Sequence, residues 1–498
     1  MDPLFEIRLD LSATNSRDLT HALCSQLKAS IIAGRLAPGM RLPATRQAGR
    51  FFGVSRNTAA AVYEELLNQG YVITRQGSGT FVAERVPEAP RRTAHRDQAA
   101  SRYHLNEFWL RPDVTAAMGF WEDPAESQSG SVERAPLDFR PALVDSRLFP
   151  FEVFRRVSAK QLRGLEKRPA RYRSPQGNQG NFHLRTAVTR HIALTRAVVC
   201  DAGDVLVTSG AQQAFDLLAR VLVTPGQTVV AVEDPGYPPM RVAFAAAGAK
   251  LVPVGVDAEG LIVERLPADS RVISLCPSHQ FPLGVPMSMR RRKALLEFAA
   301  THDAVIVEDD YDGEFRFADS PLDALKASDA ANAVFYVGTF SKCMLPAFRL
   351  GFIVAPAWSM PTLVAAKNCF DWHCSTPLQL AVARFILEGH LARHVRKMRE
   401  IYRRRRELLL RLLGQKVEDW LKPLPSFYGM HVAALARGAV DLEAAAQALL
   451  QSDVRLHTLR RYYLGRPQGS GLVIGYGAAD LPQITRGMSL LRSVLLAQ

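Results

Sequence analysis

One lysine, Lys342, follows an apolar run at residues 333–337 and stands beside two hydroxyl side chains, Thr339 and Ser341. Burying a lysine as a cation is costly, so its pKa falls there and the neutral amine can form a Schiff base with an aldehyde. Arg349, further along the chain, could hold a phosphate together with the hydroxyls. These residue types suggest a site for pyridoxal phosphate (PLP), with Lys342 as the Schiff-base lysine. The alternative is a surface turn with a solvated lysine.

Two other turns carry groups that such a cofactor would need. Ser209, Gly210, Ala211 and Gln212 lie between an apolar run and a helical pattern. The backbone N–H groups and the dipole of a helix N-terminus favour a phosphate at such a place. Tyr237, in the stretch EDPGYP, can stack on a pyridine ring. Taken singly, these motifs also fit an ordinary strand-to-helix turn and a core tyrosine.

The stretch EDDY supplies a carboxylate and a phenol directly after a buried apolar run. Asp309 could hold the pyridinium N–H of the cofactor and keep its ring an electron sink, and Tyr311 could donate to the phenolic oxygen. His279 and Gln280 could touch the ring from its far side. The alternative for EDDY is a solvated acidic loop. The spacing of the histidines and cysteines predicts no metal site.

The elements that must position these residues alternate between strand and helix from about residue 180 onward. Apolar runs predict strands at residues 204–208, 228–232, 271–275, 304–307 and 334–337. This alternation predicts an α/β fold, with a mostly parallel sheet covered by helices on both faces. The motif residues follow the C-terminal ends of the strands, where open α/β sheets bind ligands.

The N-terminal region has a different pattern. Apolar spacing predicts a first helix from Leu19 to Ile31, a short second helix at residues 45–52, and a third helix that begins after Ser55 and ends at Gly70. Residues 71–74 and 80–82 predict a two-stranded hairpin around a glycine-containing turn. Three helices followed by a hairpin indicate a winged helix-turn-helix.

In such a fold the N-terminal turn of the third helix enters the major groove of DNA. Arg56 can bond a guanine edge with two hydrogen bonds, and Asn57 can bond an adenine edge. Residues near this turn and in the wing are placed to meet phosphates or the minor groove. The full set of predicted DNA contacts is Arg46, Ser55, Arg56, Asn57, Thr58, Arg75 and Gly77. The alternative is a solvated helix end.

Length and composition indicate a soluble protein with more than one domain and an acidic partner. The 498 residues are 48% hydrophobic and 22% charged, which is typical of a soluble globular protein. The net charge of +14 indicates an acidic partner, of which nucleic acid is the usual one. Six scattered cysteines indicate a reducing compartment. The N-terminus lacks the apolar core of a signal peptide, and no apolar run is long enough to cross a membrane. We therefore expect a cytoplasmic protein that does not associate with membranes.

These patterns predict three regions. Residues 1–83 form the winged helix, residues 84–135 form a linker rich in Pro, Arg and Ala, and residues 136–498 form the PLP-binding domain, with a small subdomain at roughly 376–498. The linker contains one aromatic patch, at residues 103–121, which could dock on a domain or fold as a short element of its own.

Both halves resemble known families. The stretches AGRLAPGMRLPATR, FGVSRNTAAAVYEELLNQGYV and RQGSGTFV resemble the GntR-type winged helix. The stretches TSGAQQAFDLLARVL, VEDPGYP, PSHQFPLGV, VEDDYDGEFRF and GTFSK resemble the fold-type I PLP enzymes of the aspartate aminotransferase superfamily. The combination resembles the MocR/GabR-type regulators, which fuse these two domains.

The resemblance implies roles for individual residues. Lys342 would carry the cofactor, Gly210, Ala211, Ser341 and Arg349 would bind its phosphate, and Arg461 would bind the carboxylate of an effector. It also implies a head-to-tail homodimer that reads a DNA operator. The effector would be a small amine, an amino acid or PLP itself.

Two departures from the aminotransferases bear on activity. Phe281 stands where they usually carry an asparagine, and residues 472–477 lack the arginine that often binds a substrate carboxylate. We therefore expect a PLP-dependent transcription regulator with at most a residual half-reaction. The rival hypotheses are a working aminotransferase that carries a DNA-binding domain and a regulator whose cofactor is purely structural.

Overall fold

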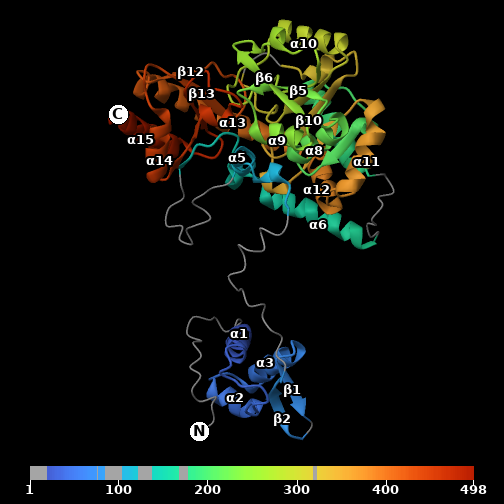
Figure 1. Cartoon of the computed structure of the whole chain (residues 1–498), viewed down its shortest axis with the longest axis vertical. Helices are drawn as coiled ribbons and strands as arrows, with labels where there is room; N and C mark the ends of the chain where they lie inside the picture. The colour runs from blue at the N-terminus through green and yellow to red at the C-terminus, as the bar shows by residue number, and fades with distance from the viewer. Residues whose placement is uncertain (1–18, 76, 85–103, 122–136, 168–177, 318–321) are drawn as a thin grey trace. The chain divides into compact units, whose positions relative to one another are not determined.

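The computed structural model describes residues 19–75, 77–84, 104–121, 137–167, 178–317 and 322–498 (Figure 1). The chain divides into two compact units, Met1–Asn106 and Glu107–Gln498. Each unit has its own hydrophobic core. Among the described residues, no helix combines the length and the apolar character that a membrane crossing requires.

The first unit is a winged helix, as the sequence predicts. Its elements are α1 (Leu19–Ile32), α2 (Thr45–Phe51), α3 (Arg56–Asn68), β1 (Val72–Arg75) and β2 (Gly79–Val82). The buried stripe of α3, which includes Val62 and Leu66, packs against Leu23 and Leu27 of α1. The strands β1 and β2 pair antiparallel, so the hairpin forms the wing.

The second unit is built on an eight-stranded sheet with the order β4-β11-β10-β9-β8-β5-β6-β7. Its strands are β4 (Val205–Thr208), β5 (Val229–Asp234), β6 (Lys250–Asp257), β7 (Gly260–Leu261), β8 (Ser270–Leu275), β9 (Val305–Asp310), β10 (Val334–Thr339) and β11 (Gly351–Val354). The pairs from β10 to β6 are parallel, whereas β11 runs antiparallel to β4 and β10, and β7 runs antiparallel to β6. The predicted fold class, with a mostly parallel sheet, is confirmed.

Helices cover both faces of this sheet, because its central strands are buried on both sides. Val337 and Val307 face the side covered by α8 (Ala211–Leu222), α9 (Pro238–Ala246) and α11 (Met360–Phe370). Alternate residues of the strands, such as Ile306 and Tyr336, face the opposite side. That side is covered by α7 (Phe182–Arg196), α10 (Met289–Thr301) and α12 (Thr376–Leu387).

The C-terminal part adds a four-stranded antiparallel sheet with the order β12-β13-β16-β15. Its strands are β12 (Leu421–Pro423), β13 (His431–Ala436), β15 (His457–Thr458) and β16 (Gly471–Gly475). The helices α13 (His390–Lys416), α14 (Leu442–Gln451) and α15 (Leu481–Leu496) pack beside it, and the helix α6 (Phe151–Lys167) lies against α12 (Figure 1). The short strands β3 (Leu137–Asp138) and β14 (Val454–Arg455) pair with each other.

Part of the predicted linker is folded onto the second unit. The connecting segment, which we define as residues 107–121, consists of η2 (Glu107–Leu110), α5 (Pro112–Met118) and η3 (Gly119–Trp121). The helix α5 contacts α9 of the second unit. Phe120 is only 2% exposed, so it anchors this segment in the second unit.

Gly338, near the C-terminal end of β10, lies in tight contact with the neighbouring strand. A Cβ atom added to Gly338 would lie 2.3 Å from the ring of Phe352 on β11. We expect Gly338→Ala to lower the stability of the protein by about 1–3 kcal/mol, because the ring cannot withdraw without disturbing both strands. Gly414→Ala in α13 is the control, since nothing lies within 4 Å of its added Cβ, and alanine favours a helix. Thermal unfolding measures both variants, and equal melting temperatures would contradict the expectation.

Candidate functional site

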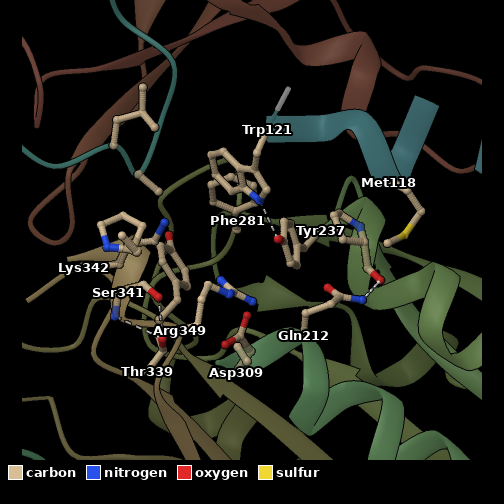
Figure 2. A pocket seen from close by; sticks show the side chains of 17 residues that line it. Met118, Trp121, Gln212, Tyr237, Phe281, Asp309, Thr339, Ser341, Lys342 and Arg349 are labelled. Atoms are coloured by element: carbon tan, nitrogen blue, oxygen red, sulfur yellow. Dashed lines mark hydrogen bonds between the residues drawn. The ribbon is translucent and has the colours of Figure 1, made fainter. Parts of the chain in front are cut away.

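The ends of several strands open into one cavity of about 550 Å³ in the second unit (Figure 2). Asp309 reaches it from β9, and Thr339, Ser341 and Lys342 reach it from the end of β10. These strands are parallel neighbours, so their carboxyl ends meet at one edge of the sheet. The structure thus brings together groups that are thirty or more residues apart in the sequence, from Asp309 to Thr339, Ser341 and Lys342.

Lys342 has the environment that its chemistry needs. Its enclosure by the cavity walls lowers the pKa of the amine to about 8, because burial disfavours the charged form. The Nζ atom lies 4.7 Å from the centre of the Trp121 ring. A neutral amine, the form that attacks an aldehyde, is therefore accessible near physiological pH.

The two adjacent carboxylates at the end of β9 have opposite surroundings. Asp310 accepts hydrogen bonds from Arg196 Nε and Tyr336 Oη, each at 2.6 Å. Asp309 is 4% exposed, and its Oδ1 atom has no hydrogen-bond partner among the described residues. Within the described part of the chain, its Oδ2 atom accepts a hydrogen bond only from the thiol of Cys276, at 3.7 Å. Burial raises the pKa of Asp309 to about 8.

Tyr311 is oriented by a buried pair. Its hydroxyl lies 2.7 Å from Nδ1 of His279, and the same nitrogen lies 3.0 Å from Oδ2 of Asp312. The three side chains are at most 8% exposed, so solvent does not compete for these contacts. His279 therefore supports Tyr311 from behind, whereas the sequence suggested direct contact between His279 and a cofactor ring.

The part of the cavity at the start of α8 is suited to a phosphate. Gly210 has a φ of 81° and is followed directly by α8, whose first turn has no side-chain cap. A Cβ atom at Gly210 would lie 3.0 Å from Nη2 of Arg349, so glycine lets the guanidinium approach the helix end. Thr339 donates to Ser341 Oγ at 3.0 Å, which places two hydroxyls on the same side. Free N–H groups, hydroxyls and a guanidinium form an anion site.

These residues fit PLP. The observation that tests the fit is the buried carboxylate of Asp309, whose Oδ1 atom has no hydrogen-bond partner among the described residues. A buried carboxyl oxygen without a partner is costly, and a ring N–H would satisfy it. The ring would lie between this carboxylate and the amine of Lys342, with its phosphate at the start of α8. The half-buried Tyr237 lines the same cavity and could lie against such a ring.

The predicted DNA-contacting turn is well formed in the first unit. Ser55 caps α3, because its Oγ accepts a hydrogen bond from the backbone N–H of Thr58 at 3.0 Å. Arg56 and Asn57 follow in the first helical turn and are exposed. Arg46, Arg75 and Gly77 are exposed as well.

Comparison with known proteins matches each unit to a family. Residues 149–471 match the family described as aminotransferase class I and II, and residues 19–82 match the bacterial regulatory proteins of the gntR family. The probable rhizopine catabolism regulatory protein MocR of Rhizobium meliloti is 34% identical over 95% of this chain and 93% of that protein. The chain belongs to the MocR-type transcriptional regulators.

Two further comparisons bear on the cofactor of this MocR-type regulator. The pyridoxine biosynthesis transcriptional regulator PdxR of Corynebacterium glutamicum is 28% identical, over 96% of each chain. The α-aminoadipate aminotransferase LysN of Thermus thermophilus covers 75% of this chain and 98% of its own, with 26% identity and a TM-score of 0.66. That enzyme was solved with N-(5'-phosphopyridoxyl)-L-leucine. Family membership makes PLP the cofactor of the aminotransferase-like domain.

The structure also decides which further residues of this regulator line the cavity, two of which the sequence did not single out. Met118 and Trp121 of the connecting segment line the cavity, although the linker pattern carried no signal for them beyond an aromatic patch. Phe281 lines it too. Arg461 does not line this cavity. It belongs to a neighbouring one, where its guanidinium lies 5.6 Å from the Phe120 ring.

The unsatisfied carboxylate predicts an unusual pH dependence in the regulator prepared without PLP. The pKa of Asp309 is higher in the folded protein, about 8, than its ordinary value of 3.8, so the folded state binds this proton more tightly. The free energy of unfolding therefore falls as the pH rises from the lower of these two pKa values to the higher. We expect Asp309→Asn to be more stable than the wild type by about 1–3 kcal/mol near pH 8. The gain should shrink near pH 5, as measured by thermal unfolding at each pH.

Asp310→Asn is the matched control, because it should do the opposite. This substitution leaves Arg196 without its buried partner and should cost about 3–5 kcal/mol. A wild-type advantage over Asp309→Asn at pH 8 without PLP would contradict our account of Asp309.

Proposed function

We propose that this MocR-type regulator uses PLP to sense a small amine, an amino acid or PLP itself, and that occupancy of the cavity alters how it binds DNA. The observation that carries this proposal is the pairing of an orphaned buried carboxylate, Asp309, with the lowered pKa of the Lys342 amine in one cavity. When bound, PLP supplies an aldehyde carbon that can exchange one amine for another. Recognition of an amine therefore needs no complete catalytic cycle.

Each side chain of the cavity has a proposed task. Lys342 supplies the amine that attaches the cofactor, Asp309 accepts the ring N–H, and Tyr311 donates to the phenolic oxygen. Tyr237 lies against the ring. The phosphate is held by the backbone and side chains of Gly210, Ala211, Gln212, Ser341 and Arg349. The side chain of Gln212 is directed to the carbonyl of Pro239, at 2.9 Å, so we assign its role to the backbone N–H.

Arg461 remains a predicted site for an effector carboxylate. In the structure it lines the neighbouring cavity and lies against Phe120, whereas Lys342 lines the main one.

DNA contact is assigned to the first unit. The capped turn at Ser55 exposes Arg56 and Asn57, and the half-buried Thr58 completes this turn. The exposed Arg46, Arg75 and Gly77 would meet the backbone or minor groove. The net charge of +14 favours a polyanionic partner. We further propose a cytoplasmic head-to-tail homodimer, with a winged helix at residues 1–83, a linker at 84–135 and a sensor domain at 136–498.

The visible absorption of the PLP-loaded protein, titrated with a panel of amines and amino acids, tests the proposal. A stable change with one compound, with no keto acid formed, supports a sensor. Conversion to the pyridoxamine form, with turnover after addition of a keto acid, would replace it with an aminotransferase. A spectrum that no compound changes would leave PLP itself as the signal.

We expect Lys342→Ala to abolish the visible absorption that depends on attachment of PLP to the lysine, while basal DNA binding stays within about twofold of the wild type. The reason is that Lys342 belongs to the second unit and the DNA contacts to the first. Absorption spectra and gel-shift titrations measure the two properties separately. An unchanged spectrum would show that another residue attaches the cofactor.

We expect Arg56→Ala to weaken specific DNA binding by about 1–3 kcal/mol, because it removes one contact to a base edge. Asn57→Ala should have a similar effect. Asn68→Ala, at the opposite, exposed end of α3, is the matched control and should leave binding unchanged. The measurement is a gel-shift titration with DNA that the wild-type protein selects from a random pool. Equal affinity of all three variants would disprove the assignment of this turn.

A further inference from the structure

The connecting segment is anchored beside the cofactor cavity by one aromatic side chain. The ring of Phe120 makes edge-on contacts with Tyr237, His457 and Tyr462, at centroid distances of 5.8, 5.0 and 5.6 Å. Such contacts stabilise the packing of the ring beyond the burial of its apolar area. The next residue, Trp121, is therefore held at a defined place.

Trp121 uses this position to reach into the cavity (Figure 2). Its indole N–H donates to the hydroxyl of Tyr237 at 2.9 Å, and its backbone carbonyl accepts from Arg140 at 3.4 Å. The face of its ring lies 4.7 Å from the amine of Lys342. Figure 2 shows Trp121 and Met118 entering from the side opposite to Asp309 and Thr339. The indole therefore lies next to the atom at which an amine would exchange.

The side chains that line the cavity are of two kinds, a few charged groups and a larger apolar set. Among the described residues that line the cavity, the charged side chains are Asp309, Lys342 and Arg349, and the proposed function assigns all three to the cofactor. Apart from Tyr237 and Lys342, which contact the indole, the lining includes the apolar side chains of Met118, Ala142, Leu143 and Phe281. A second charge on a ligand would lose its hydration here without gaining a partner.

We propose that Trp121 is a ligand-contacting residue that selects primary amines with an apolar or aromatic body. This inference rests on the proposed function, because it concerns the same cavity in its PLP-loaded state. The indole face attracts an ammonium group on entry and then packs against the body of the ligand. The residue belongs to the stretch of chain between the DNA-binding unit and the sensor domain, so a ligand that shifts the indole acts directly on that stretch.

Titration of the PLP-loaded full chain with matched amines tests the inference. The probes are 2-phenylethylamine, ethanolamine, 4-aminobutyrate and phenylalanine, and the readout is the concentration of each that half-saturates the change in visible absorption. We expect 2-phenylethylamine to act at the lowest concentration, by about tenfold over ethanolamine. Trp121→Ala should remove this advantage and leave the response to ethanolamine within about twofold.

Two variants guard against a trivial loss of structure. Trp121→Phe keeps an aromatic face but loses the hydrogen bond to Tyr237, so it should retain most of the preference for 2-phenylethylamine. Trp109→Ala removes a tryptophan from the same segment that lies outside the lining of the cavity, and it should behave as the wild type. The visible spectrum before addition of amine shows that each variant is loaded with PLP.

The outcomes separate this inference from the proposed function. An equal loss of response to every amine in Trp121→Ala would overturn the selective role of the indole while amine sensing stands. A stronger response of the wild type to 4-aminobutyrate or phenylalanine than to 2-phenylethylamine would also overturn it, because a carboxylate partner, with Arg461 as the predicted one, would then bind the ligand. If no amine changes the wild-type spectrum, amine sensing itself is wrong and this inference falls with it.

Discussion

The site depends on the burial of two adjacent carboxylates at the end of β9. Successive strand residues point to opposite faces of a sheet, so Asp309 and Asp310 cannot share one partner. Asp310 is neutralised by Arg196 of α7, at 2.6 Å, and receives a hydrogen bond from Tyr336 of β10. This buried network ties the end of the strand to its neighbours. It leaves Asp309 directed into a cavity whose protein groups do not satisfy it, and a bound cofactor can supply the missing partner.

The same burial acts in opposite directions on the acid and the base of the cavity. It raises the pKa of Asp309 to about 8 and lowers that of Lys342 to about 8, because a low-dielectric environment disfavours either charge. Without its cofactor the cavity therefore holds two groups that are each costly to ionise. The packing of helices on both faces of the sheet supplies the stability that offsets this cost. A ligand that brings complementary charge lowers the cost of ionising these two groups, so the cavity favours such a ligand.

The order of elements along the chain has a consequence for regulation. A sensor domain can report on its ligand only if some part of the protein has different contacts with and without it. We propose the connecting segment for this part, because it supplies Trp121 to the cavity wall and continues toward the winged helix in the sequence. Phe120 anchors the segment while its neighbour Trp121 lies against the amine of Lys342, so in our proposal one residue attaches the segment and the other contacts the ligand.

The sequence by itself determined the local elements and the chemistry of the site. Hydrophobic periodicity and glycine turns predicted the winged helix and the main parallel strands. The motifs around Lys342 and Asp309 suggested the cofactor. Each of these signals is contained in a few consecutive residues, so the sequence alone reveals it. Only the tertiary structure decided contacts between distant segments. Trp121 meets Tyr237, 116 residues away, Arg196 meets Asp310, 114 residues away, and Arg461 lies behind Phe120 in a second cavity. No local spacing encodes such contacts, because they arise when separately formed elements pack together.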